Sequence, residues 1–268
     1  MSQPIRYLEQ TLPGESGPGR VAYRHCSANT SMSGIPAETK TPGILFCGGF
    51  HSNMDGGKAE FLSGFCPDLG MAFTRFDYRG HGLSDGNFAD GTIGDWYEDA
   101  KLIFDNACTG PQVVVGSSMG AWMAMMLARD RAARIKGLIL IAPAPDFPRK
   151  LILPALPPEA RAALDRDDVW YRPSEFEDDP YPITRRLIEE SAAHQMLDGP
   201  KLSVAGPVRI LHGTADEVVP MAHAERVAAS IDAPSVDLEI VDGGDHRLST
   251  DADLARLGRA VAEVVQGL

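Results

Sequence analysis

The sequence predicts an α/β protein with a mostly parallel central sheet, helices on both faces of the sheet and an inserted helical lid. Apolar runs at residues 44–47 and 113–115, and at 135–142 apart from Lys136, are typical of strands that are covered on both faces. Helical patterns separate these runs, as the crossovers of a parallel sheet require. A long proline-rich stretch then interrupts the alternation, which favours an insertion between two core strands.

The chain begins with two short strand patterns, at residues 5–11 and 20–26, with prolines and glycines between them. This arrangement predicts an antiparallel hairpin at one edge of the sheet. A polar loop follows and reaches residue 43, where the first continuous apolar run begins.

The other core elements follow from the helical and strand periodicities. Trp96, Ala100 and Phe104 recur at helical spacing, which predicts an amphipathic helix around them. Along the chain these patterns predict helices at residues 58–69, 92–108, 222–230 and 251–265, and strands at residues 72–78, 208–211 and 236–241.

The proline-rich stretch holds two helical patches, at residues 158–167 and 183–197, with Trp170 between them. It is too irregular for another strand unit and lies between two core strands, so we predict a lid of helices and loops. The predicted boundaries are 1–145 and 208–268 for the core and 146–207 for the lid.

Composition and charge exclude several classes of partner. The 25 basic and 37 acidic residues give a formal charge of −12, which opposes binding to nucleic acid and to anionic membranes. No apolar run reaches the roughly 18 residues of a membrane span, and no export or import signal is visible at the N-terminus. The four cysteines show no paired spacing, so we expect reduced thiols and a cytoplasmic protein without stable membrane insertion.

The segment Gly116-Ser117-Ser118-Met119-Gly120 carries a nucleophile motif. Three valines precede it and a helical pattern follows it. A G-x-S-x-G motif between a buried strand and a helix is typical of a nucleophile elbow, where a sharp turn lifts a serine hydroxyl clear of the backbone. The register makes Ser118 the predicted nucleophile and Ser117 its neighbour.

A serine nucleophile needs a base and an acid that orients the base, and in this motif's usual setting they follow on later strand ends in the order acid, then histidine. Asp216 follows the strand at 208–211, and His246 follows the strand at 236–241. We therefore predict Asp216 as the acid and His246 as the base. Glu217 and Asp146 are rival candidates for the acid.

An oxyanion hole completes such a site. One donor is the backbone N–H after the nucleophile, which is Met119, and the second is expected on the loop after the first parallel strand, at Phe50 behind Gly48 and Gly49.

Three further residues are candidates for the substrate pocket. His51 borders the predicted oxyanion loop, and Met54 and Trp170 are apolar candidates for contact with an acyl group. Trp170 has an alternative role, which is to anchor the lid to the core. We expect His81 to be structural.

Neither a metal nor a cofactor is expected. No set of histidines, cysteines and carboxylates has metal-ligand spacing, and no glycine-rich loop is followed by Lys-Ser or Lys-Thr.

With these residues identified, the chain resembles the α/β-hydrolase family over nearly its whole length. More narrowly, it resembles the α/β-hydrolase-domain group of mitochondrial acyl-protein (palmitoyl-protein) thioesterases, which are also known as acyl-glucuronide esterases. The similar segments are Gly49-Phe50, Ser52 to Gly56, Lys58-Ala59, Arg75 to Tyr78, Gly80 to Gly82, Ser84 to Gly86, Gly116 to Gly120, Leu211 to Gly213, Asp216, Val219-Pro220, Asp245 to Arg247, and the lid residues Trp170, Pro173, Tyr181 and Pro182.

The resemblance implies an α/β-hydrolase fold and a triad of Ser118, Asp216 and His246. It also implies hydrolysis of acyl thioesters or activated esters, on small molecules or on proteins. Since no presequence is visible, we expect a bacterial relative of the group.

Two alternatives stay open on the residues alone. One triad on one fold serves many leaving groups, so a broad carboxylesterase or a hydrolase of amide or carbon–carbon bonds is the nearest alternative. A ligand receptor that retains the fold without catalysis belongs to another class, and the intact set of serine, aspartate and histidine opposes it.

Overall fold

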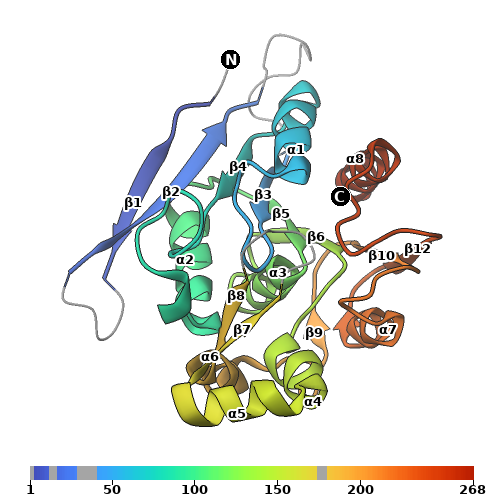
Figure 1. The fold of residues 1–268 in the computed structure, drawn as a ribbon. Coiled ribbons are helices and arrows are strands. Elements are labelled where there is room, and N and C mark those ends of the chain that lie inside the picture. Colours follow the sequence, from blue (N-terminus) through green and yellow to red (C-terminus); the bar gives the residue numbers. More distant parts are fainter. Residues whose placement is uncertain (1–2, 12–16, 29–40, 174–179) are drawn as a thin grey trace.

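The fold is given by a computed structural model that describes residues 3–11, 17–28, 41–173 and 180–268. Within these residues, eight strands form one sheet in the order β1-β2-β4-β3-β5-β6-β10-β12 (Figure 1). Strand β2 is antiparallel to both of its neighbours, and the strands from β4 to β12 run parallel. The strands of this sheet are β1 (Arg6–Gln10), β2 (Gly19–Cys26), β3 (Gly43–Cys47), β4 (Phe73–Phe76), β5 (Gln112–Ser117), β6 (Ile135–Ile141), β10 (Val208–Gly213) and β12 (Val236–Val241).

Helices cover both faces of the sheet, and the sheet separates the core into two apolar layers. Helices α1 and α8 enclose one layer, and α2, α3 and α7 enclose the other. The mostly parallel α/β architecture predicted from the sequence is therefore confirmed. The bounds are α1 (Gly57–Asp68), α2 (Ile93–Asn106), α3 (Met119–Asp130), α7 (Met221–Ala229) and α8 (Asp251–Gln266), and a 3₁₀ turn, η1 (Phe88–Asp90), precedes α2.

Local sequence signals set the ends and faces of these helices. Thr92 and Thr250 form capping boxes at the starts of α2 and α8, each with an aspartate three residues later. The stripe of Trp96, Ala100 and Phe104 is buried, as its spacing predicts.

Residues 146–207, which we call the insertion, join β6 to β10, and these two strands pair directly in the sheet. The helix predicted at residues 158–167 is present as α5. The helix predicted at 183–197 differs, because residues 183–184 lie in a strand, residues 191–194 form a 3₁₀ helix and residues 195–197 are not helical. The elements are η2 (Pro148–Ile152), α4 (Leu153–Ala155), α5 (Pro158–Asp167), β7 (Val169–Arg172), β8 (Tyr181–Thr184), α6 (Arg185–Glu190), η3 (Ser191–His194) and β9 (Leu202–Ser203).

Two small sheets were not predicted from the sequence. Strands β7 and β8 pair antiparallel, and β9 pairs parallel with β11 (Ile231–Asp232). The insertion is therefore a mixture of helices and short strands, where helices and loops were expected.

Asp146 joins the beginning of the insertion to a point near its end. Its carboxylate is fully buried and accepts hydrogen bonds from the backbone N–H groups of Met196 and Leu197, at 2.9 and 3.0 Å. Without these two donors, burial of the carboxylate would cost free energy of folding. The pair of bonds therefore holds the insertion against the end of β6.

Parts of two predictions lie outside the described residues. Most of the turn of the N-terminal hairpin falls at residues 12–16, and most of the polar loop before β3 falls at residues 29–40. Of the helices in the described ranges, none has the length and apolar character that a membrane span requires.

Candidate active site

The turn between β5 and α3 places Ser118 in a strained backbone conformation. Its φ and ψ are 55° and −116°, outside the regions that a serine normally adopts. Its N–H donates to the carbonyl of Ile141 at 2.8 Å, and its own carbonyl accepts from Ala121 at 3.0 Å. Hydrogen bonds to the neighbouring strand and to the following helix therefore maintain this strained conformation.

The two glycines of the motif are required by close contacts. A Cβ atom on Gly116 would overlap the backbone of Gly120, and one on Gly120 would overlap the carbonyl oxygens of Cys47 and Gly48. The elbow is thus packed directly against the end of β3. This contact brings the loop after β3 next to the serine.

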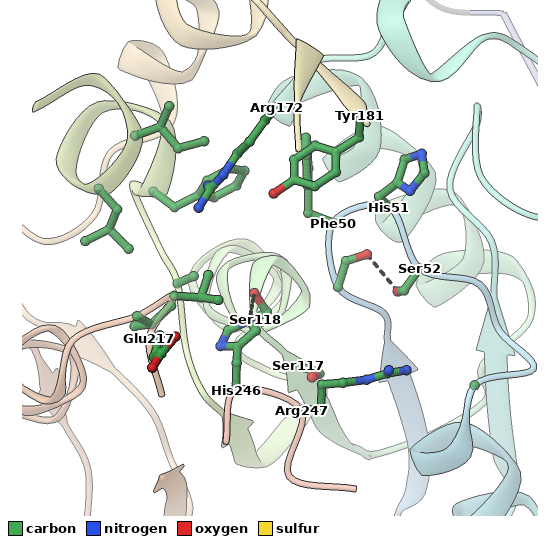
Figure 2. A pocket seen from close by; sticks show the side chains of 18 of the residues that line it. Phe50, His51, Ser52, Ser117, Ser118, Arg172, Tyr181, Glu217, His246 and Arg247 are labelled. Atoms are coloured by element: carbon green, nitrogen blue, oxygen red, sulfur yellow. Dashed lines mark hydrogen bonds between the residues drawn. The ribbon is translucent and has the colours of Figure 1, made fainter. Parts of the chain in front are cut away.

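The structure brings the predicted serine, histidine and aspartate together in one hydrogen-bonded chain. Nε2 of His246 lies 3.1 Å from Oγ of Ser118, and Nδ1 of His246 lies 2.8 Å from Oδ2 of Asp216 (Figure 2 shows the first contact). Each residue lies just beyond the carboxyl end of a different parallel strand, β5, β10 or β12. Their order along the chain is the predicted one.

Asp216 is fully buried, and its second oxygen accepts from the N–H groups of Val218 and Val219 at 2.9 and 2.8 Å. Burial acts to raise the pKa of Asp216. The hydrogen bonds from His246 and from these two N–H groups outweigh burial, so the pKa lies below its usual value. The carboxylate is therefore charged at neutral pH and oriented toward Nδ1 of His246.

Neither rival acid reaches His246. The carboxylate of Asp146 is occupied by the backbone of the insertion. Glu217 lines the cavity but makes no hydrogen bond with His246 in the described structure. His212 lies behind Asp216, where it is buried and its Nε2 lies 3.0 Å from the Val219 carbonyl. Its contacts are those of a structural support for the Asp216 loop.

The loop after β3 passes beside the nucleophile. A Cβ on Gly49 would lie 3.5 Å from the Cβ of Ser118, which places Phe50 next to the elbow. Within the described parts of the chain, no protein group accepts a hydrogen bond from the backbone N–H of Phe50 or of Met119. Both predicted oxyanion donors are therefore free of protein acceptors there.

Residues after β4 form hydrogen bonds that fix the loop after β3 in place. Asp77 accepts from the N–H of Met54 at 2.6 Å, Nε2 of His81 lies 3.2 Å from the N of His51, and the Tyr78 hydroxyl donates to the Gly48 carbonyl at 3.3 Å. Met54 was expected to line the substrate pocket, but it is 1% exposed and is not among the residues that line the cavity. Its N–H is used to anchor the loop.

A cavity of about 600 Å³ opens over Ser118 and His246. Of the predicted pocket residues, His51 and Trp170 line it, together with Phe50 (Figure 2 labels Phe50 and His51). Trp170 also packs against the core, so its position suits both of the roles considered for it. The Phe50 ring contacts Phe88, Trp96, Phe147 and Tyr181 edge-on, at centroid distances of 4.8–5.6 Å.

Comparison with known families agrees with this geometry. A family model described as "Alpha/beta hydrolase family" matches residues 44–259. The chain belongs to the α/β-hydrolase family. The family resemblance inferred from the sequence motifs is therefore confirmed, and the molecule is a hydrolase by fold and descent.

The chain is similar to several members of that family. Palmitoyl-protein thioesterase ABHD10, mitochondrial, from Mus musculus is 40% identical over 232 residues, which cover 85% of this chain and 77% of that protein. A solved structure of mouse α/β-hydrolase domain-containing protein 10 has a TM-score of 0.82 at 35% identity and covers 97% of this chain and 98% of its own. A crystallised protein from Agrobacterium vitis S4 has a TM-score of 0.88 at 34% identity, with coverage of 98% and 100%.

In this α/β-hydrolase, the β7–β8 pair forms part of the cavity wall that sequence reasoning missed. Arg172 lies directly opposite Tyr181 in the pair, and both side chains line the cavity (Figure 2). The intervening Tyr171 is 59% exposed on the other face. The alternation of Trp170, Tyr171 and Arg172 is the signal that could have revealed the strand, and with it the two polar residues.

Among the described residues of this α/β-hydrolase, no cluster of three or more histidines, cysteines, aspartates or glutamates is placed to hold a metal ion.

Proposed function

We propose that this protein is a serine hydrolase that cleaves acyl thioesters or activated esters, in the manner of acyl-protein thioesterases and acyl-glucuronide esterases. The observation that carries the proposal is the hydrogen-bonded chain from Ser118 through His246 to Asp216, which faces a cavity of about 600 Å³. Similarity to a palmitoyl-protein thioesterase supports the choice of bond.

In this mechanism the Ser118 hydroxyl attacks the acyl carbonyl while Nε2 of His246 takes its proton. His246 then gives that proton to the leaving group, and the acyl group remains on Ser118. A water molecule, activated by the same histidine, releases the acid in a second cycle. Asp216 stabilises the imidazolium form and keeps the hydrogen of neutral His246 on Nδ1, because its charged oxygen lies 2.8 Å from that atom.

The tetrahedral intermediate carries a negative oxygen, which the backbone N–H groups of Phe50 and Met119 would bind. Their freedom from protein acceptors supports this role. Preorganised donors of this kind lower the activation free energy, because they need no rearrangement when negative charge develops on the oxygen.

The proposal is tested by covalent labelling combined with a substrate panel. A fluorophosphonate should label the wild-type protein at Ser118, as mapped by mass spectrometry, and Ser118→Ala should abolish labelling. Ser117→Ala is the matched control, because it removes the neighbouring hydroxyl from the same turn. Loss of labelling in Ser117→Ala alone would place the nucleophile one residue earlier.

The substrate panel compares p-nitrophenyl esters, acyl thioesters and an acyl glucuronide. Turnover of thioesters or activated esters that falls at least about a thousandfold in Ser118→Ala supports the proposed function. Hydrolysis restricted to simple carboxylic esters favours the carboxylesterase alternative. Tight binding without turnover favours a receptor.

We also propose that the protein acts in the cytoplasm. The cysteines of the described chain are free thiols, which suits a reducing compartment. The mammalian relatives are named as mitochondrial. Cell fractionation followed by fluorophosphonate labelling distinguishes the two locations, and recovery of the labelled protein outside the soluble cytoplasmic fraction would contradict the proposal.

A further inference from the structure

We propose that Arg172 is a specificity-determining residue that binds an anionic group, a carboxylate, on the substrate. This inference rests on the proposed hydrolase function and narrows its substrate class to esters and thioesters that carry a second, negatively charged group.

The position of Arg172 is fixed by the β7–β8 pair. Arg172 and Tyr181 are direct cross-strand partners, so their side chains leave the pair on the same face. Trp170, two residues earlier, lies on that face as well, and all three line the cavity. Figure 2 shows the guanidinium of Arg172 and the hydroxyl of Tyr181 directed into the space above Ser118 and His246.

The guanidinium of Arg172 has no acceptor among the residues that the structure describes. The residue is partly buried, yet no carboxylate or carbonyl of the described chain accepts a hydrogen bond from it. Arg161 and Arg185 of the insertion do have acceptors, since Arg161 donates to the carbonyls of Leu153 and Leu156 and Arg185 donates to Asp168. Arg172 thus has a planar set of N–H donors available, and carboxylates match that set with two parallel bonds.

Among the described residues, the charge around the cavity has the opposite sign to that of the whole protein. The charged side chains of these residues that line the cavity are Lys58, Arg172 and Arg247, against Glu217, in a chain of net charge −12. Lys58 is engaged elsewhere, because its ammonium donates to the Arg247 carbonyl and to Ser249. A local excess of positive charge in a cleft attracts anions and raises their rate of encounter.

Arg172 lies across the cavity from the reacting atoms, so the anionic group it binds must lie several atoms from the scissile carbonyl. Two parts of a substrate can supply such a group. It can be the far end of a dicarboxylic acyl chain, or it can belong to the leaving group. The chemistry at Arg172 is the same in both cases, and one arm of the experiment addresses each.

The experiment measures kcat/KM for two matched pairs of substrates. The acyl arm compares mono-p-nitrophenyl adipate with its methyl ester, which lacks the free carboxylate. The leaving-group arm compares 4-(butanoyloxy)benzoate with its methyl ester. In each arm the readout is the ratio of anionic to neutral substrate, compared between protein variants, so that differences in intrinsic reactivity cancel.

In Arg172→Met the ratio should fall about 10- to 100-fold in at least one arm, the loss expected for a charge-assisted hydrogen-bonded pair. In Arg172→Lys the ratio should fall less, because lysine keeps the positive charge and lacks only the planar set of guanidinium N–H donors. Arg149→Met is the control, since Arg149 belongs to the same insertion but does not line the cavity. Its ratio should stay at the wild-type value.

The arm in which the ratio falls identifies the part of the substrate that carries the anion. An unchanged ratio in both arms for Arg172→Met would overturn the inference while leaving the hydrolase function intact. An equal fall in Arg149→Met would also overturn it, because the effect would then be one of overall charge.

A binding measurement separates this inference from the proposed function. Calorimetry of mono-p-nitrophenyl adipate and of 4-(butanoyloxy)benzoate with Ser118→Ala and with the double variant Ser118→Ala/Arg172→Met requires no turnover. At least tenfold weaker binding of one of them by the double variant supports the role of Arg172 even if the protein hydrolyses no ester. Equal affinities for both compounds would contradict it.

Discussion

Nε2 of His81 lies 3.2 Å from the backbone nitrogen of His51 and accepts its hydrogen bond. Nδ1 of the same ring lies 3.2 Å from the carbonyl of Arg79 and donates to it. This pair of contacts requires a neutral ring with its hydrogen on Nδ1. His51 has a φ of 58°, so the residue that follows Phe50 is held in an unusual conformation by a buried side chain.

Replacement of His81 should therefore lower turnover more than substrate affinity. In His81→Phe the N–H of His51 loses its acceptor, and the neighbouring N–H of Phe50 loses its fixed direction. We expect kcat to fall about 10- to 100-fold with a smaller change in KM, since the donor is displaced and not removed. His81→Gln keeps an acceptor and a donor and should recover part of the loss.

Kinetics with a p-nitrophenyl ester check this prediction, together with inhibition by an alkyl boronic acid that mimics the tetrahedral intermediate. The boronic acid should bind more weakly to His81→Phe in proportion to the fall in kcat. A loss of thermal stability with unchanged kcat would show that His81 has only a structural role.

His81 should also make stability depend on pH. Burial lowers its pKa from 6.5 to about 4 in the folded protein, whereas the unfolded chain takes up the proton near the ordinary value. The contribution of neutral His81 to the free energy of unfolding is therefore fully present above pH 6.5 and is lost as the pH falls from about 6.5 to about 4, by up to about 3 kcal/mol. Urea unfolding at several pH values should show a shallower loss in His81→Gln. Parallel curves for the two proteins would contradict the prediction.

Asp216→Asn should abolish most activity without unfolding the protein. The amide oxygen can still accept from Val218 and Val219, so the amide NH₂ faces Nδ1 of His246. That arrangement favours the tautomer with hydrogen on Nε2, which cannot take a proton from Ser118. We expect kcat to fall by about 10⁴ with little change in thermal unfolding.

Glu217→Gln is the matched control for this substitution, because it alters the adjacent carboxylate, which does not bond to His246. Its kcat should change only a few-fold. A larger loss in Glu217→Gln than in Asp216→Asn would reassign the acid.

Gly120→Ala and Gly64→Ala should change stability in opposite directions. A methyl group at residue 120 would overlap the carbonyls of Cys47 and Gly48, which are fixed in the sheet and the loop after it, so we expect a loss of about 3 kcal/mol or more. Residue 64 lies on the exposed side of α1, where a Cβ atom would have no other atom within 4 Å, and alanine there should add about 0.5–1 kcal/mol. Urea denaturation measures both, and a Gly120→Ala protein as stable as the wild type would refute the packing argument.

The sequence predicted the core well because its signals are local. The apolar run before Gly116 needs both faces covered, and the position of His246 after the last strand follows from chain order. The positions of Ser118, Asp216 and His246 could therefore be predicted before their distances were known. The capping residues Thr92 and Thr250 mark helix starts in the same local way.

The insertion was harder to predict because its structure depends on tertiary contacts. Strands β7 and β8 have four residues each, and Pro182 lies in the middle of β8, so neither has a strong periodic signal. Arg172 and Tyr181 acquire their common direction only through that pairing. Met54 was misassigned because its apolar side chain suggested a pocket, while the structure uses its backbone N–H to bond Asp77.

The hydrogen bonds that the backbone N–H groups of Met196 and Leu197 donate to Asp146 bring the two ends of a long segment to one point beside the sheet. A segment closed in this way can be lengthened, shortened or exchanged without a change in the register of β6 and β10. The part of the cavity wall that the insertion supplies can thus vary separately from the sheet that holds Ser118, Asp216 and His246. Transplanting the segment enclosed by these bonds from one homologue to another becomes a direct route to an enzyme with a new substrate range.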